Sequence, residues 1–529
     1  MLYGVDRAAW DVGPTESGAR HTGASRLARL SDATRALCAN RVYLALLLLG
    51  VAIAARFSQF GNPVIQVDEE FYLLTGDRML HGALPYVDIW DRKPVGLFLL
   101  YAGIRLLGGE GVLQYQIVAG LFVTATAFTI AILARRMTGP LGATAAAIIY
   151  ILYLGVFGGD GGQSPVFYNL PMAVAALLTL RVVENERLGW GSFASGTVAM
   201  LLVGLALQIK YSAIFEGAFL GLTLLWCVQR RYGLSSACVM ALVWGAAALL
   251  PTAGAWAYYA AIGHGSEFVQ ANFLSILSRG SDGWFRALRR LFGMAMLLAP
   301  LGLSAWLAPV PDLSDVRGRC ARSFVLQWLF AAIAGVLLFG SYFDHYALPL
   351  LVPLCIAAAP LFEDRRAGLL ITGPGRQWRV PAGITVMLIA TVFSISTINK
   401  NRRDRGWGPQ LDRIAGFIKP RLTGSLYVFH GEPSLYRLTG SRLPTRWIFP
   451  NHLNLTREDG TLGVDSLSEV ERIMGTRPQF IVTSTRPERD INPVTWRYME
   501  AQIGRYYRLA LTEEIGIRSR LVYERRSPQ

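Results

Sequence analysis

Long apolar stretches, each near the length needed to cross a membrane, recur through this 529-residue sequence. A helix crosses a bilayer core with about 20 predominantly apolar residues. The chain is 53% hydrophobic and 16% charged, whereas soluble domains usually carry about 25% charged residues. We therefore predict an all-α polytopic membrane domain of about eleven helices. The expected spans are 41–60, 112–134, 140–158, 164–182, 191–209, 211–228, 234–261, 291–308, 324–341, 346–362 and 380–397.

Arginines occupy every second connection between these spans, which indicates an orientation. Cytoplasmic loops collect Lys and Arg, so we place the N-terminus in the cytoplasm and the C-terminus outside. The short apolar segment 94–107 would reverse every later loop if it crossed the membrane, so we expect it to lie along the interface. The basic residues concerned are Arg135, Arg136, Arg181, Arg187, Arg230, Arg231, Arg317, Arg319, Arg322, Arg365, Arg366, Arg376 and Arg379.

The two ends of the chain differ from this apolar centre. Residues 1–40 combine arginines with Gly, Ser and Thr, which is typical of a flexible basic cytoplasmic tail. Residues 41–399 form the predicted membrane domain, with a first outer loop at 61–111. Residues 400–529 alternate helical and strand-like patterns, which predicts a small α/β domain outside the cytoplasm. The helical patterns lie near 409–418, 466–474 and 493–503, and the strand-like runs begin at Ser425, Gln479, Tyr507 and Arg520.

Charge and cysteine content exclude several classes of function. The net charge of +15 would suggest nucleic acid for a soluble protein, but the basic loops of a membrane protein account for it, and we expect no nucleic-acid partner. The five cysteines show no metal-like spacing, so neither a disulfide framework nor a zinc site is predicted. Membrane lipids are the expected surroundings.

The first outer loop carries the residues most suggestive of chemistry. Asp68, Glu69 and Glu70 come directly after the first span, and Lys93 follows in the same loop. A carboxylate can take a proton from a substrate hydroxyl as a general base, and a lysine can pair with a phosphate. Together they suit transfer onto a hydroxyl with a phosphate leaving group. From residue types alone, an ordinary solvated acidic loop explains the acids equally well.

The spacing of these residues resembles a known family. The run Asp68-Glu69-x-x-Tyr72, followed by Lys93-Pro94, is similar to the first outer loop of the GT-C glycosyltransferases. The nearest resemblance is to protein O-mannosyltransferases, aminoarabinose transferases of lipid A and galacturonosyltransferases of rhizobial lipopolysaccharide. It covers roughly residues 41–400 and includes two later motifs, Gln208-Ile-Lys210-Tyr211 and His345-Tyr346-Ala-Leu348-Pro349.

The resemblance implies roles for particular residues. Asp68 would be the catalytic base, with Glu69 beside it, and the donor phosphate would be bound by Lys93, Lys210, His345 and Tyr346. Tyr72, Asp160 and Glu216 are further candidates. Val95 stands where relatives often have a second proline, and Gln163 and Asn169 open the fourth span where many relatives carry an acid, so that Asp160 is the nearest acid. No cofactor is assigned with certainty: the donor substrate would be a polyprenyl-phosphate sugar, and a divalent metal stays possible but unsupported.

Several of these residues have simpler interpretations, which stay open. Lys210 would also fit a snorkelling lysine, and Tyr346 an aromatic residue at the membrane interface. Glu216, inside the sixth span, could be a buried partner of a hydroxyl rather than a functional acid. Four arginines before the eighth span, Arg279, Arg286, Arg289 and Arg290, could hold anionic lipid or acceptor phosphates, or simply anchor the helix.

The function that the resemblance implies is an inverting glycosyltransferase. It would move a sugar from a polyprenyl-phosphate-linked donor to a hydroxyl of lipopolysaccharide or lipid A, a cell-envelope glycan or a protein, at the outer face of the cytoplasmic membrane. The absence of P-loop and Rossmann motifs agrees with a donor that is not a nucleotide. One alternative is a transporter or flippase of lipid-linked sugars, which would spread charges through the mid-membrane. Another is a polysaccharide polymerase or ligase, which usually has its large loop late in the chain.

Overall fold

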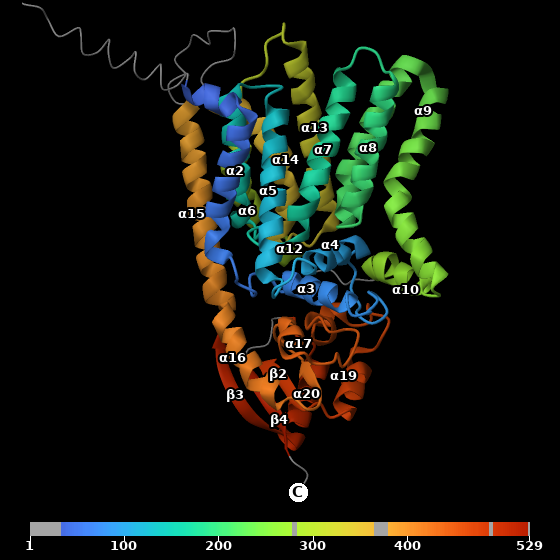
Figure 1. Cartoon of the computed structure of the whole chain (residues 1–529), viewed down its shortest axis with the longest axis vertical. Helices are drawn as coiled ribbons and strands as arrows, with labels where there is room; N and C mark the ends of the chain where they lie inside the picture. Colours follow the sequence, from blue (N-terminus) through green and yellow to red (C-terminus); the bar gives the residue numbers. More distant parts are fainter. Residues whose placement is uncertain (1–32, 278–282, 364–378, 486–489, 527–529) are drawn as a thin grey trace, which may run out of the picture.

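The computed structural model describes residues 33–277, 283–363, 379–485 and 490–526. It consists of a bundle of long helices with a smaller α/β domain stacked at one end (Figure 1). Most of the predicted tail, 1–40, lies outside the described residues, as do Arg279, Arg365, Arg366 and Arg376.

The bundle contains the apolar helices predicted from the sequence. Among the described residues, nine helices are long and apolar enough to cross a membrane, and α6 is a shorter apolar helix. Large apolar side chains such as Leu242, Trp306 and Phe330 are at least 75% exposed, as expected for surfaces that face lipid. The helices are α2 (Arg41–Arg56), α5 (Val112–Ala134), α6 (Pro140–Val156), α7 (Ser164–Glu184), α8 (Trp190–Leu207), α9 (Ile214–Ala261), α12 (Trp284–Leu307), α13 (Val316–Phe339), α14 (Leu351–Ala358) with η4 (Asp344–Leu350) and η5 (Ala359–Phe362) at its two ends, and α15 (Arg379–Arg405).

The long helix α9 contains a break that matters for the number of spans. Gly233 lies inside it with a φ of 81°, a left-handed conformation that interrupts the helix. The sequence predicted separate spans at 211–228 and 234–261, on either side of this glycine. A multi-span helical domain is therefore confirmed, whereas the count of eleven stays a prediction.

The basic connections gather at the end of the bundle where α2 begins. Arg135 donates to the backbone oxygen of Ala39 (3.4 Å), next to that first helix. Arg136 pairs with Glu184 at 2.9 Å, at the end of α7. The C-terminal domain lies at the opposite end (Figure 1), which is the arrangement that an odd number of spans requires.

Two short helices lie across the other end of the bundle, between the long helices and the C-terminal domain (Figure 1). They are α3 (Val67–Met79) and α4 (Val95–Arg105), and α4 corresponds to the segment expected along the interface. They approach closely at Gly76, where an added Cβ would lie 2.6 Å from the backbone nitrogen of Ala102. Later in the chain, α9 is followed by the short helices α10 (Gly265–Val269), η3 (Gln270–Leu274) and α11 (Ser275–Leu277).

The C-terminal domain is a small mixed sheet with helices, as predicted. Its strand order is β1-β2-β4-β3, with β1 parallel to β2 and the other neighbours antiparallel. Residues of β1 and β2 are buried throughout. The helix α15 continues to Arg405, past the predicted boundary at 400. The elements are α16 (Gly408–Ile418), β1 (Leu426–Val428), α17 (Ser434–Thr439), α18 (Asn451–Asn454), α19 (Ser466–Gly475), β2 (Phe480–Ser484), α20 (Pro493–Tyr506), β3 (Tyr507–Ile515) and β4 (Arg518–Arg525).

The first outer loop is held against this domain by polar contacts. Arg92 pairs with Glu458 at 2.6 Å and donates to Thr461 at 2.7 Å. Arg78 of α3 donates to the backbone oxygen of Ser441 at 2.7 Å. These interactions fix α3 between the bundle and the domain, and α3 carries the three acids of the loop.

Candidate active site

The three adjacent acids of α3 face three different surroundings. Successive helical residues are rotated by about 100°, so Asp68, Glu69 and Glu70 diverge within one turn. Asp68 is half-buried and faces the lysines of the predicted site. Glu69 is 0% exposed and packs toward the connection between α6 and α7. Glu70 accepts a hydrogen bond from Ser434 of the C-terminal domain. Asp68 is therefore the acid of this turn that is available to a substrate.

The surroundings of Asp68 favour its ionised form. Burial alone would raise the pKa of Asp68. Lys93, His345, a hydrogen bond from Gln163, and Lys210 together outweigh burial, so that the pKa lies below its usual value. The Gln163 nitrogen lies 3.5 Å from the carboxylate. Asp68 is also in the first turn of α3, where the helix dipole favours negative charge. An ionised carboxylate is what a general base requires.

Lys93 lies beside this carboxylate in the same loop. Its ammonium nitrogen is 5.5 Å from the ring centre of Tyr72, and its backbone carbonyl accepts a hydrogen bond from Tyr86 at 2.8 Å. Asp91 accepts a hydrogen bond from the Lys93 backbone nitrogen. The buried Tyr72 hydroxyl has no hydrogen-bond partner among the described residues. The loop thus presents a cation over an aromatic ring, close to Asp68.

Lys210 and Tyr346 come from distant parts of the sequence and meet in the structure. Lys210 follows α8, and its ammonium nitrogen lies 4.3 Å from the ring centre of Tyr346. Burial, together with repulsion from Lys93, lowers the pKa of Lys210 to about 7. His345 contacts Tyr346 edge-on, with ring centres 4.8 Å apart. The predicted donor-phosphate residues therefore lie around one region, although they were assigned from separate motifs.

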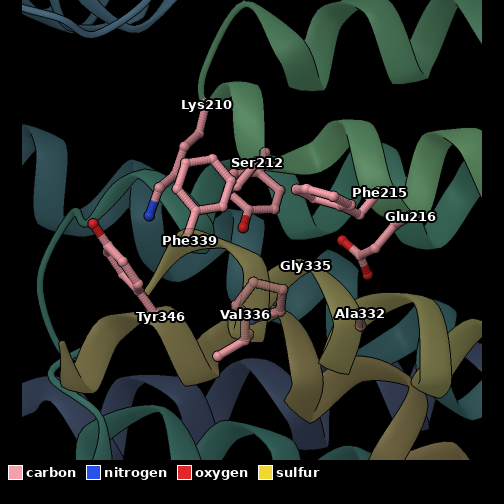
Figure 2. Close-up of a pocket in the computed structure, with 11 residues that line it drawn as sticks. Lys210, Ser212, Phe215, Glu216, Ala332, Gly335, Val336, Phe339 and Tyr346 are labelled. Carbon is pink, nitrogen blue, oxygen red and sulfur yellow. The ribbon is translucent and has the colours of Figure 1, made fainter. Parts of the chain in front are cut away.

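A pocket opens from this region between α9 and α13 (Figure 2). Its cavity volume is about 30 Å³, so the pocket is narrow in this conformation. Lys210 and Tyr346 lie toward one end and Glu216 toward the other (Figure 2). The remaining lining residues are mainly apolar: Tyr168, Ser212, Phe215, Ala332, Gly335, Val336, Phe339 and Pro349. A lysine at one end of a largely apolar pocket suits contact with an anionic group such as a phosphate.

Glu216 has a partner that the sequence did not suggest. It is 4% exposed, and its carboxylate accepts a hydrogen bond from the Trp328 indole nitrogen at 2.8 Å. The partner is therefore an indole of α13 rather than a Ser or Tyr hydroxyl. Glu216 lines the pocket on the side away from Lys210 in the view of Figure 2.

Glu69 and Asp160 belong to a buried cluster behind Asp68. Burial, with Asp160 nearby, raises the pKa of Glu69 to about 8, and burial also raises the pKa of Asp160. Asp160 accepts a hydrogen bond from Gln59 at 2.7 Å. Full burial prevents Glu69 from touching a substrate in this conformation, so its position supports a structural role more than the catalytic one expected from the loop motif.

Arg56 is the residue of this cluster that sequence reasoning missed. It is 3% exposed and donates to the backbone oxygens of Gly159, at 2.7 Å, and Gly161. An arginine near the end of an otherwise apolar span was a usable signal, because charged residues in such positions usually have a specific partner.

Metal-ligating side chains do not gather around Asp68 in the part of the chain that the structure describes. In the four described stretches of the chain, no group of three or more His, Cys, Asp or Glu side chains could hold one. Asp68 instead faces two lysines, whose charges would oppose a nearby cation.

Comparisons with known proteins show the fold. No family model matches the sequence, and no curated protein matches it. The structure is similar to ArnT from Cupriavidus metallidurans in the apo state, with 15% identity over 92% of this chain and 99% of that chain and a TM-score of 0.61. The structure of the same protein bound to undecaprenyl phosphate is similar too, with 16% identity over 90% of this chain and 97% of that chain and a TM-score of 0.59.

A second similar structure is an oligosaccharyltransferase from Archaeoglobus fulgidus, tethered with an acceptor peptide. It has 10% identity over 84% of this chain and 69% of that chain, with a TM-score of 0.52. These neighbours are GT-C glycosyltransferases. The chain therefore has the GT-C fold, as the loop motifs predicted.

Proposed function

We propose that this protein is an inverting glycosyltransferase that moves a sugar from a polyprenyl-phosphate donor to an acceptor hydroxyl. The observation that carries the proposal is the half-buried Asp68 carboxylate, which acts electrostatically on both Lys93 and Lys210. A base for a hydroxyl and cations for a departing phosphate thus lie near one another, and Lys210 also lines the pocket.

The proposed reaction assigns one task to each group. Asp68 takes the proton of the acceptor hydroxyl as its oxygen attacks the anomeric carbon. The bond between that carbon and the phosphate oxygen breaks, and the electron pair leaves with the polyprenyl phosphate. Lys93 and Lys210 stabilise the negative charge of the leaving phosphate, an electrostatic effect aimed at the transition state. Attack opposite the leaving group inverts the anomeric centre.

The neighbours support a lipid-linked donor. One ArnT structure is bound to undecaprenyl phosphate, and Lys210 lies at one end of a largely apolar pocket. We place the reaction at the outer face of the cytoplasmic membrane, with the C-terminal domain, residues 400–529, outside the cytoplasm and close to the acceptor. The acceptor is a glycolipid, glycan or protein hydroxyl.

The test compares surface glycolipids, by mass spectrometry, in cells with the wild-type chain, without it, and with Asp68→Asn. The Asn variant keeps the shape of the side chain but cannot accept the proton, so we expect an inserted protein and at least about a hundredfold loss of transfer. Asp77→Asn is the matched control, because Asp77 lies on the same helix and pairs with Arg105 at 2.9 Å. Normal transfer by Asp68→Asn would contradict the proposal.

A further inference from the structure

The connection between α6 and α7, Gly158–Gln163, is fixed from several sides. Arg56 holds the carbonyls of Gly159 and Gly161, and the Tyr101 hydroxyl donates to the carbonyl of Gly162 at 2.7 Å. Three of the four backbone oxygens from Gly159 to Gly162 are therefore bound by side chains of α2 and α4. Such a connection cannot shift without breaking buried hydrogen bonds, each of which is costly to leave unpaired.

The glycines of this connection also leave no room for movement. At Gly162 an added Cβ would lie 2.7 Å from the Tyr115 ring, and at Gly159 it would lie 2.9 Å from Leu348. The backbone is thus packed directly against neighbouring side chains. Gln163, the last residue of the connection, is 1% exposed, so its side chain has little freedom.

We propose that Gln163 is a positioning residue: the fixed connection Gly158–Gln163 holds the Gln163 amide against Asp68, so that the carboxylate is oriented and kept ionised for catalysis. This inference rests on the proposed role of Asp68 as the base. The amide nitrogen must face Asp68, because the amide oxygen would repel a carboxylate. The separation of 3.5 Å is long, and such contacts often tighten when a substrate binds.

Gln163 differs from the other groups that act on Asp68, because it carries no charge and cannot bind the donor phosphate as a cation. Its contribution can therefore be removed without removing a phosphate ligand. Asp68 also interacts electrostatically with charged or titratable side chains around it. These are Lys93, Lys210, His345, Asp91, Tyr72 and Tyr101.

The experiment measures the protonation of Asp68 directly, without the donor. A carbodiimide reacts with protonated carboxyl groups, and mass spectrometry of the purified full chain in detergent locates the label. At pH 5 the labelling rate of Asp68 is proportional to its protonated fraction. Gln163→Met keeps the size of the side chain but removes the donor, so we expect a higher pKa of Asp68 and about threefold faster labelling.

Two further variants sharpen the test. Gln163→Glu places a second carboxylate beside Asp68, and we expect about tenfold faster labelling because like charges disfavour ionisation. Asn454→Leu removes a fully buried amide that donates to the Phe429 carbonyl within the C-terminal domain, and it should leave the rate unchanged. Thermal unfolding of each variant reports whether it is folded.

The possible outcomes separate this inference from the proposed function. Unchanged labelling in folded Gln163→Met, together with inactive Asp68→Asn, would overturn the role of Gln163 and leave the base in place. Faster labelling in Gln163→Met with fully active Asp68→Asn would show that the amide acts on a carboxylate that is not the base, which contradicts both. If Gln163→Met does not fold, Gln163→Asn replaces it in the test. The shorter Asn side chain does not bring its amide to Asp68, so the labelling rate of Asp68 must rise about threefold in this variant as well.

Discussion

The hydroxyl of Ser434 donates a hydrogen bond to the carboxylate of Glu70 at 2.5 Å, and so joins α3 to the C-terminal domain. Both side chains are at least 96% buried. Burial, with Glu432 nearby, raises the pKa of Glu70 to about 8. The helix that carries Asp68 is therefore attached to the domain by an acid that is mostly protonated at neutral pH.

This attachment should make stability depend on pH. Glu70 binds its proton more tightly in the folded state than in the unfolded chain, so its contribution is complete below about pH 4.5 and is lost as the pH rises through about 8. Glu70→Gln cannot ionise and should unfold about 2–4 °C higher than wild type at pH 8.5, with no gain at pH 5. Thermal unfolding in detergent at both pH values checks this, and an equal shift at the two values would contradict it.

Lys210 should make phosphate binding sensitive to pH. Its pKa of about 7 means that its charge is lost as the pH rises from 6 to 8.5. Undecaprenyl phosphate is a usable probe, and its affinity should fall over this range about three- to tenfold more in wild type than in Lys210→Arg, because arginine stays charged. Titration of the phosphate itself affects both proteins equally. Identical pH dependence in the two proteins would remove Lys210 from the binding site.

Much of the fold was predictable because the length of an apolar stretch and the residues of a turn determine the local secondary structure. Gly233, for example, separates two apolar stretches that the sequence already assigned to different spans, and its positive φ breaks α9 there. The strand-like run from Gln479 became β2 for a similar reason: an apolar run between polar turns needs burial on both faces.

The site was less predictable because its residues meet only through long-range packing. Lys210 and Tyr346 are brought together by helices distant in sequence, and only resemblance to a family had grouped them. The partners of Arg56 are backbone oxygens, which carry no sequence signal. Glu69 is an acid next to Asp68 in the sequence, but the rotation between adjacent helical residues places its side chain in the buried interior.

The orientation of the chain gives a separate prediction. Arg136 and Glu184 pair at one end of the bundle, and the C-terminal domain lies at the other end (Figure 1). Cytoplasmic loops collect basic residues, so an alkaline phosphatase fused after Gln529 should be active outside the cytoplasm, whereas the same reporter inserted after Arg231 should be inactive. The opposite pattern would place Asp68 on the cytoplasmic side and exclude an externally presented donor.

Gly162 provides the last prediction, because it lies where the fixed connection meets α4 and α5. An added Cβ would lie 2.7 Å from the Tyr115 ring, so Gly162→Ala must displace either that ring or the backbone that carries Gln163. Overpacking of this kind costs about 1–3 kcal/mol, and we expect lower thermal stability and at least about tenfold slower transfer. Gly120→Ala on α5, where nothing lies within 4 Å, is the control and should be neutral or more stable by up to about 1 kcal/mol. Equal behaviour of the two variants in thermal unfolding and transfer assays would show that the connection is not tightly held.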